Sequence, residues 1–195
     1  MIIHTIKVGA MATNCYLVED EATKKALVID PGDDADKILK AISENKLIAD
    51  QILITHGHYD HVEAVIPLKA ALRAAVMISQ SDLFGGKGAD IVQPDIFIKE
   101  NDRVKVGDLV LTVIECPGHT PGGVSLYSKE EKVIFTGDTL FARTWGRTDL
   151  PYSSEEAMKT SLKKLLSLPP DTRVYPGHGR STTIGEEQGL LAEIE

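Results

Sequence analysis

Residues 55–61 read THGHYDH and come directly after the largely apolar run QILI of residues 51–54. This stretch places three of the chain's six histidines and one aspartate within six positions. Imidazole is the commonest metal-binding side chain, and a carboxylate supplies a usable oxygen ligand. The pattern H-x-H-x-D-H at the end of an expected buried strand therefore predicts a metal site. Taken alone, the stretch also fits a polar surface loop, so the rest of the sequence has to support the metal interpretation.

Length and composition predict a single domain over residues 1–195, because a chain that is 43% hydrophobic can form one sizeable core. The formal net charge is −8, with 21 basic against 29 acidic residues, which disfavours nucleic acid as a partner. No stretch approaches the roughly 20 apolar residues that span a bilayer, so we expect a soluble protein with no membrane partner. The two cysteines, Cys15 and Cys116, cannot form a disulfide framework, which favours a cytoplasmic location.

Strand and helix patterns alternate in the first half of the chain, and the second half is mostly strand. The expected strands of the first half cover residues 2–8, 15–19, 25–32, 51–55 and 75–79, and the expected helices cover 34–47 and 62–73. Residues 81–95 are expected to be irregular and to form a pocket wall or lid.

In the second half, the expected strands cover residues 103–116, 123–128, 132–138 and 169–177. Ser153 and Glu156 form a capping-box pattern before a helix, and a short helix is expected near Glu186. Two sheets with helices outside them follow from this order. The predicted fold class is α+β, as a four-layer αββα sandwich.

Three further residues of metal-binding types follow the same pattern as THGHYDH. Each comes after an apolar run and lies inside a glycine-containing turn. They are His119 in ECPGHTPGG, Asp138 in VIFTGDTLF and His178 in RVYPGHGRS. Loops at one edge of a sheet scaffold converge on a common site, so we expect these side chains to join those of THGHYDH. His4 stands alone in an alternating strand pattern and is expected to lie outside the site. Cys116 is interpreted as a small buried hydrophobic residue.

The ligand count favours two metal ions. Five imidazoles and two carboxylates exceed the four ligands of one tetrahedral zinc, whereas three ligands per ion plus a shared carboxylate suit a binuclear centre. Zinc is the favoured ion. Iron and manganese are alternatives, because imidazole also suits iron and carboxylates admit manganese.

The four motifs THGHYDH, PGHTPGG, FTGDTLF and YPGHG resemble those of the metallo-β-lactamase superfamily, and in particular its glyoxalase II-like hydrolases. The resemblance spans nearly the whole chain and implies the αββα fold. It implies one ion held by His56, His58 and His119. It implies a second ion held by Asp60, His61 and His178, with Asp138 as the bridging ligand. Asp60 and Asp138 are the predicted catalytic carboxylates.

The expected reaction is hydrolysis of a small thioester or ester by a metal-bound hydroxide, because a divalent ion lowers the pKa of bound water to about 7. A lactonase is an alternative within the same chemistry. An alternative from another class is a persulfide dioxygenase with one iron, whose ligands would be His56, His119 and Asp138. A metal-loaded module without catalysis is a third reading, and it requires an inaccessible site.

Several departures from the family pattern bear on the substrate. Gly-Gly usually follows the first motif, whereas Glu63 and Ala64 stand there in this chain, and the sequence extends only 17 residues beyond His178. The short extension, together with a last motif that reads GHG followed by Arg180 where the family has Gly-His-Glu-Tyr, weakens the case for a glutathione thioester. Arg147 and Arg180 are candidates for contact with an anionic part of the substrate, and Trp145 is a candidate for the pocket wall. The sequence leaves the oligomeric state open.

Overall fold

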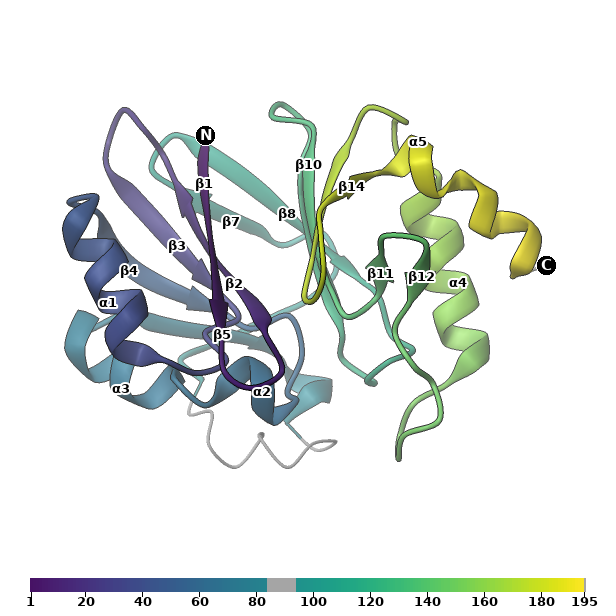
Figure 1. The fold of residues 1–195 in the computed structure, drawn as a ribbon, viewed down its shortest axis with the longest axis horizontal. Coiled ribbons are helices and arrows are strands. Elements are labelled where there is room, and N and C mark those ends of the chain that lie inside the picture. The colour runs from purple at the N-terminus through teal and green to yellow at the C-terminus, as the bar shows by residue number, and fades with distance from the viewer. Residues whose placement is uncertain (84–93, 195) are drawn as a thin grey trace.

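Two six-stranded sheets form the centre of the computed structural model, which describes residues 1–83 and 94–194 (Figure 1). The first sheet has the order β1-β2-β3-β4-β5-β6. The pairs β1–β2 and β2–β3 are antiparallel, and the pairs from β3 to β6 are parallel. The strands are β1 (Ile2–Val8), β2 (Thr13–Glu19), β3 (Lys25–Ile29), β4 (Ile48–Leu53), β5 (Ala75–Ser79) and β6 (Ile96–Ile98).

The second sheet has the order β14-β13-β10-β9-β8-β7. Only the β10–β13 pair is parallel. A two-stranded hairpin of β11 (Leu140–Phe141) and β12 (Thr144–Trp145) follows β10. The strands of the sheet are β7 (Arg103–Val106), β8 (Leu109–Glu115), β9 (Val124–Ser128), β10 (Val133–Gly137), β13 (Arg173–Pro176) and β14 (Thr182–Thr183).

The helices lie on the outer faces of the two sheets (Figure 1). On the first sheet are α1 (Ala35–Glu44) and α3 (Val65–Leu72), with the single turn α2 (Tyr59–Val62) before α3. On the second sheet are α4 (Glu155–Leu166), α5 (Ile184–Glu187) and the 3₁₀ helix η2 (Gln188–Glu193). This order confirms the predicted αββα sandwich. No helix in the described ranges is long and apolar enough to cross a membrane.

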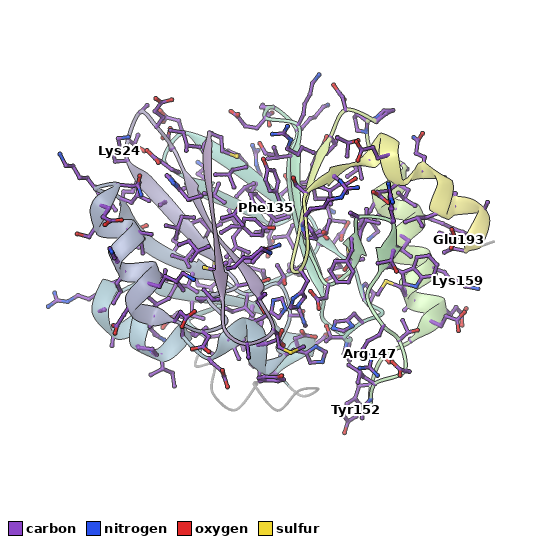
Figure 2. All side chains as sticks on the ribbon, viewed as in Figure 1. Lys24, Phe135, Arg147, Tyr152, Lys159 and Glu193 are labelled. Carbon is purple, nitrogen blue, oxygen red and sulfur yellow. The ribbon has the colours of Figure 1, made fainter. Side chains whose placement is uncertain are left out.

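The apolar side chains form three clusters, one between the sheets and one under each helical layer. Strand β2 is buried along its whole length because both of its faces are covered. Cys15 and Leu17 pack toward the helices, and Tyr16 and Val18 pack toward the other sheet. Phe135 lies near the centre of the molecule (Figure 2) and stacks on Tyr175 with ring centroids 5.3 Å apart.

Two local predictions need correction in their positions. The helix expected over residues 62–73 is present as α3, but it begins three residues later and is separate from α2, because the amide of Ala64 donates a hydrogen bond to the carbonyl oxygen of Pro31. Helix α4 is capped by Ser154, whose Oγ accepts from the amide of Ala157, and not by Ser153. The hydroxyl of Ser153 donates instead to the carbonyl oxygen of Leu150. The pocket wall predicted over residues 81–95 falls largely outside the described residues.

Candidate metal centre

All seven predicted ligand residues lie in segments that directly follow strands. The THGHYDH segment follows β4, His119 follows β8, Asp138 follows β10, and His178 follows β13. These strands belong to both sheets, so the centre lies where the two halves of the molecule meet. The side chains come together in two triads that share one further carboxylate.

The first triad consists of His56, His58 and His119. Nδ1 of His58 lies 3.1 Å from Nε2 of His56 and 2.9 Å from Nε2 of His119. Such short separations between three ring nitrogens mean that all three point toward one small volume. The candidate ligand atoms of this triad lie within 4.8 Å of one another, which leaves space for one shared cation.

The second triad consists of Asp60, His61 and His178. Nε2 of His178 lies 3.3 Å from Nε2 of His61 and 3.3 Å from Oδ2 of Asp60. Its candidate ligand atoms are also within 4.8 Å of one another. Asp60 and His61 are adjacent on α2, so this turn directs two ligands to the same point.

Asp138 lies between the triads. Its Oδ2 is 3.6 Å from Nε2 of His119 and 3.5 Å from Nε2 of His178, and its Oδ1 is 3.5 Å from Nε2 of His61. Its Oδ1 is buried and accepts no hydrogen bond from the part of the chain that the structure describes. A buried acceptor without a donor is costly unless it binds a cation, so this oxygen supports a bridging position.

Neighbouring groups fix the orientation of the ligand side chains. The Nδ1 atom of His61 donates to Oδ2 of Asp30 over 2.9 Å, and that of His119 donates to the carbonyl oxygen of Arg147 over 2.9 Å. The hydroxyl of Thr13 donates to Oδ2 of Asp60 over 3.1 Å. The two contacts to Nδ1 direct Nε2 of His61 and His119 to the centre, and Thr13 holds the same Asp60 oxygen that lies 3.3 Å from Nε2 of His178.

Asp30 contacts the candidate centre through His61, and the sequence analysis did not select it. It is buried, and it also accepts hydrogen bonds from the amide and the hydroxyl of Thr55, at 2.7 and 2.6 Å. Its sequence context, KALVI followed by Asp-Pro-Gly, is the same apolar run and glycine-containing turn that identified His119, Asp138 and His178. The signal for this residue was therefore present in the sequence.

Two imidazoles of the first triad, those of His56 and His58, are neutral near pH 7 in the absence of ions. Burial, together with the neighbouring imidazoles, lowers the pKa of His56 well below its usual value. Burial and the nearby imidazoles also lower the pKa of His58, to about 4. Neutral imidazoles have a free lone pair, so these residues are ready to bind a cation near neutral pH.

Two members of the second triad, Asp60 and His61, are charged near pH 7 in the absence of ions. Burial alone would lower the pKa of His61, but the carboxylates of Asp138 and Asp30 outweigh it and raise this pKa to about 9. The hydrogen bond to Asp60 raises the pKa of His178 in the same way. A cation that enters this triad therefore displaces a proton from the His61 ring.

An open cavity of about 410 Å³ lies over the centre. Its volume is within the range of about 300–1,000 Å³ that is usual for small-molecule sites. The lining combines candidate ligands with apolar side chains of both halves of the molecule. The described lining residues are Met11, His58, Tyr59, Asp60, His119, Asp138, Arg147, Leu150, Pro151 and His178.

Of the three predicted substrate contacts, only Arg147 is among these lining residues. Its guanidinium donates two hydrogen bonds to Asp149, and it projects from the same edge of the molecule as Tyr152 (Figure 2). Trp145 packs against the apolar cluster under α4. Arg180 donates to the carbonyl oxygen of Ser181 and is exposed.

The residues present fit two divalent cations. Two compact donor sets, a buried unpaired carboxylate oxygen between them and neutral imidazoles in one set are the features that such ions require. Imidazole with carboxylate is compatible with zinc, iron and manganese.

Comparisons with known proteins agree with this architecture. Residues 8–178 match the metallo-beta-lactamase superfamily. The chain is 37% identical to hydroxyacylglutathione hydrolase GloC of Haemophilus influenzae, over 96% of this chain and 95% of that protein. Among solved structures, it is similar to TTHA1623 in a di-iron-bound form, with a TM-score of 0.83, 40% identity and coverage of 94% of this chain and 96% of that one. It is also similar to ETHE1 from Myxococcus xanthus, with a TM-score of 0.87, 32% identity and coverage of 100% and 84%.

Proposed function

Because this chain belongs to the metallo-β-lactamase superfamily, we propose that it is a binuclear metal-dependent hydrolase that cleaves a small thioester or ester. One observation carries the proposal: two triads of ligand residues share Asp138 at the floor of an open cavity. A single iron needs three protein ligands, and a purely structural metal site is closed to solvent. The paired and accessible arrangement favours hydrolysis over both.

When bound, two divalent ions supply an ionised water near neutral pH and polarise the carbonyl group of the substrate. The chain's own residues prepare the site for this chemistry. Neutral His56 and His58 offer lone pairs, and Thr13 holds Asp60 in one orientation. The carbonyl oxygen of Arg147 fixes the tautomer of His119, because it accepts the Nδ1 proton and leaves Nε2 free. Asp60 and Asp138, the two proposed catalytic carboxylates, both line the cavity that would receive the substrate.

The cavity wall indicates the kind of substrate. Met11, Tyr59, Leu150 and Pro151 form an apolar rim above the polar floor, and Met11 and Tyr59 are 57% and 47% exposed. Arg147, the arginine among the described lining residues, is already paired with Asp149. We propose that the rim contacts the uncharged part of an acyl thioester. The relative named as a hydroxyacylglutathione hydrolase supports a thioester as the scissile group.

The test compares reaction classes on one preparation. Metal-stripped protein is loaded with zinc, iron or manganese and given a neutral acyl thioester, a hydroxyacyl glutathione thioester and a lactone under anaerobic conditions. We expect thioester cleavage that a chelator abolishes and added metal restores, with two ions per chain by elemental analysis. Oxygen uptake with a persulfide, without anaerobic hydrolysis, would show that the dioxygenase alternative is right.

The predicted cytoplasmic location is part of the same proposal. Cys15 and Cys116 are buried free thiols, which suits a reducing compartment.

A further inference from the structure

Asp82 is a buried carboxylate outside both triads that contacts the loops on either side of the first triad. It ends the 3₁₀ helix η1 (Gln80–Asp82), directly after β5, and only 2% of its surface is exposed. Oδ2 accepts from the amide of Gly57 at 2.6 Å and from the hydroxyl of Thr120 at 3.0 Å. Oδ1 accepts from the amide of Gly122 at 2.6 Å.

Two of the three donors stand next to metal-ligand candidates in the sequence, and the third, Gly122, lies three residues after His119. Gly57 separates His56 from His58, and Thr120 follows His119. One of these loops follows β4 in the first sheet, and the other connects β8 to β9 in the second. The Asp82 carboxylate therefore joins two loops from different sheets, and together these loops supply every member of the first triad.

Close packing around Asp82 supports a specific contact. A Cβ atom at position 57 would lie 2.8 Å from the carbonyl oxygen of Asp82. A Cβ at position 122 would lie 2.6 Å from the amide nitrogen of Asp82 and 2.9 Å from its Oδ1. Real side chains essentially never approach this closely, so both loops need glycine to reach the carboxylate.

We propose that Asp82 is the positioning residue of the first triad, and that it sets the distance between His119 and the His56–His58 pair. The inference rests on the proposed binuclear centre. The second triad has different supports, because Thr13 contacts Asp60 and Asp30 contacts His61. Loss of Asp82 should therefore lower the ion affinity of the first triad and leave that of the second triad unchanged.

The variant Asp82→Asn tests this with little change in volume. In asparagine, an NH2 group replaces one of the two carboxylate oxygens. Because an NH2 group donates and does not accept, it cannot pair with the amide N–H that this oxygen accepted from, and at least one of the three hydrogen bonds is lost. We expect zinc affinity at the first triad to fall about 10- to 100-fold, as for other residues that orient metal ligands. Affinity at the second triad should stay at the wild-type value.

The matched control is Thr13→Val, which removes the hydrogen bond to Asp60 without a change in shape. It should weaken the second triad and spare the first. Calorimetric titration of metal-stripped protein with zinc gives the two affinities, and imidazole ¹⁵N spectra assign each step, because His58 reports the first triad and His178 the second. Equal weakening of both positions by Asp82→Asn, or wild-type affinity at the first, would overturn the inference.

Two further measurements keep the result interpretable. In metal-free protein, the amide protons of Gly57 and Gly122 should exchange slowly in the wild type and faster in Asp82→Asn. The milder variant Thr120→Val removes one bond and should weaken the first position by a smaller factor, even if Asp82→Asn does not fold. A wild-type protein that binds no zinc would overturn the binuclear proposal and this inference together, whereas two tight ions unaffected by either variant would overturn this inference alone.

Discussion

The ring of His61 donates a hydrogen bond from Nδ1 to Oδ2 of Asp30 over 2.9 Å, and both side chains are buried. This contact leaves Nε2 of His61 as the free ring nitrogen that faces the centre. Because Thr55 donates to the same carboxylate through its amide and its hydroxyl, Asp30 also fixes the start of the THGHYDH segment. The second triad therefore depends on a residue in the loop after β3.

We expect Asp30→Asn to weaken ion binding at the second triad and to lower hydrolysis by about 10- to 100-fold. The amide cannot accept from all three donors that the carboxylate serves, so the His61 ring loses its fixed orientation. Elemental analysis and thioester hydrolysis measure the effect. Asp36→Asn, on the exposed face of α1, is the control and should match the wild type. Two tightly bound ions in Asp30→Asn would contradict the prediction.

Removal of His58 or Asp138 should abolish metal-dependent turnover and leave the fold intact. Both lie in segments outside the three apolar clusters, so His58→Ala and Asp138→Ala remove ligands without opening a core cavity. A loss of more than about 100-fold is expected, because each residue is a direct ligand in the proposed centre. Circular dichroism checks the fold, and His4→Ala is the histidine control outside the site. Full activity with one ion lost would refute the proposed roles.

The strands and the seven ligand candidates were predictable because their signals are local. An apolar run followed by a glycine-containing turn shows where a strand ends, and a histidine or aspartate in that turn shows what the strand end carries. The division between α2 and α3 was not predictable in this way. It depends on the hydrogen bond from Ala64 to Pro31, which lies beyond any local pattern.

Asp82 was missed for a similar physical reason. It belongs to a stretch without hydrophobic periodicity, and its partners Gly57 and Gly122 stand 25 and 40 positions away in the sequence. The capping of α4 shows a smaller limit: two adjacent serines precede the helix, and only the three-dimensional path of the chain selects Ser154 over Ser153.

Stability at acidic pH should depend on Glu19. Burial alone would raise the pKa of Glu19, but hydrogen bonds from Lys24 and His4 bring it below the usual 4.5. A lowered pKa in the folded state means that the contribution of Glu19 is complete above about pH 4.5 and is lost as the pH falls through the folded-state value. We expect Glu19→Gln to lower the free energy of unfolding by about 1–2 kcal/mol at pH 7.

Urea unfolding of metal-free protein at pH 7 and below pH 4 measures this effect. The difference between wild type and Glu19→Gln should shrink at the lower pH, because the wild-type carboxyl becomes protonated there. Glu21→Gln, at an exposed position nearby, is the control and should change stability little at either pH. A difference that does not depend on pH would exclude the ionised carboxylate as its source.

The charge of Arg147 should tune the preference between neutral and anionic substrates. Its guanidinium lines the cavity and donates to both oxygens of Asp149, which lowers the pKa of that carboxyl to about 2. An exposed pair of this kind is weak, so Asp149→Asn should free the arginine and lower KM for a carboxylate-bearing thioester roughly two- to fivefold. Arg147→Met should raise that KM, and KM for a neutral thioester should change little in both variants.

Arg180→Met is the control, because Arg180 is not among the described residues that line the cavity. Equal changes of KM for both substrates would show that the arginine acts on the shape of the cavity and not through its charge.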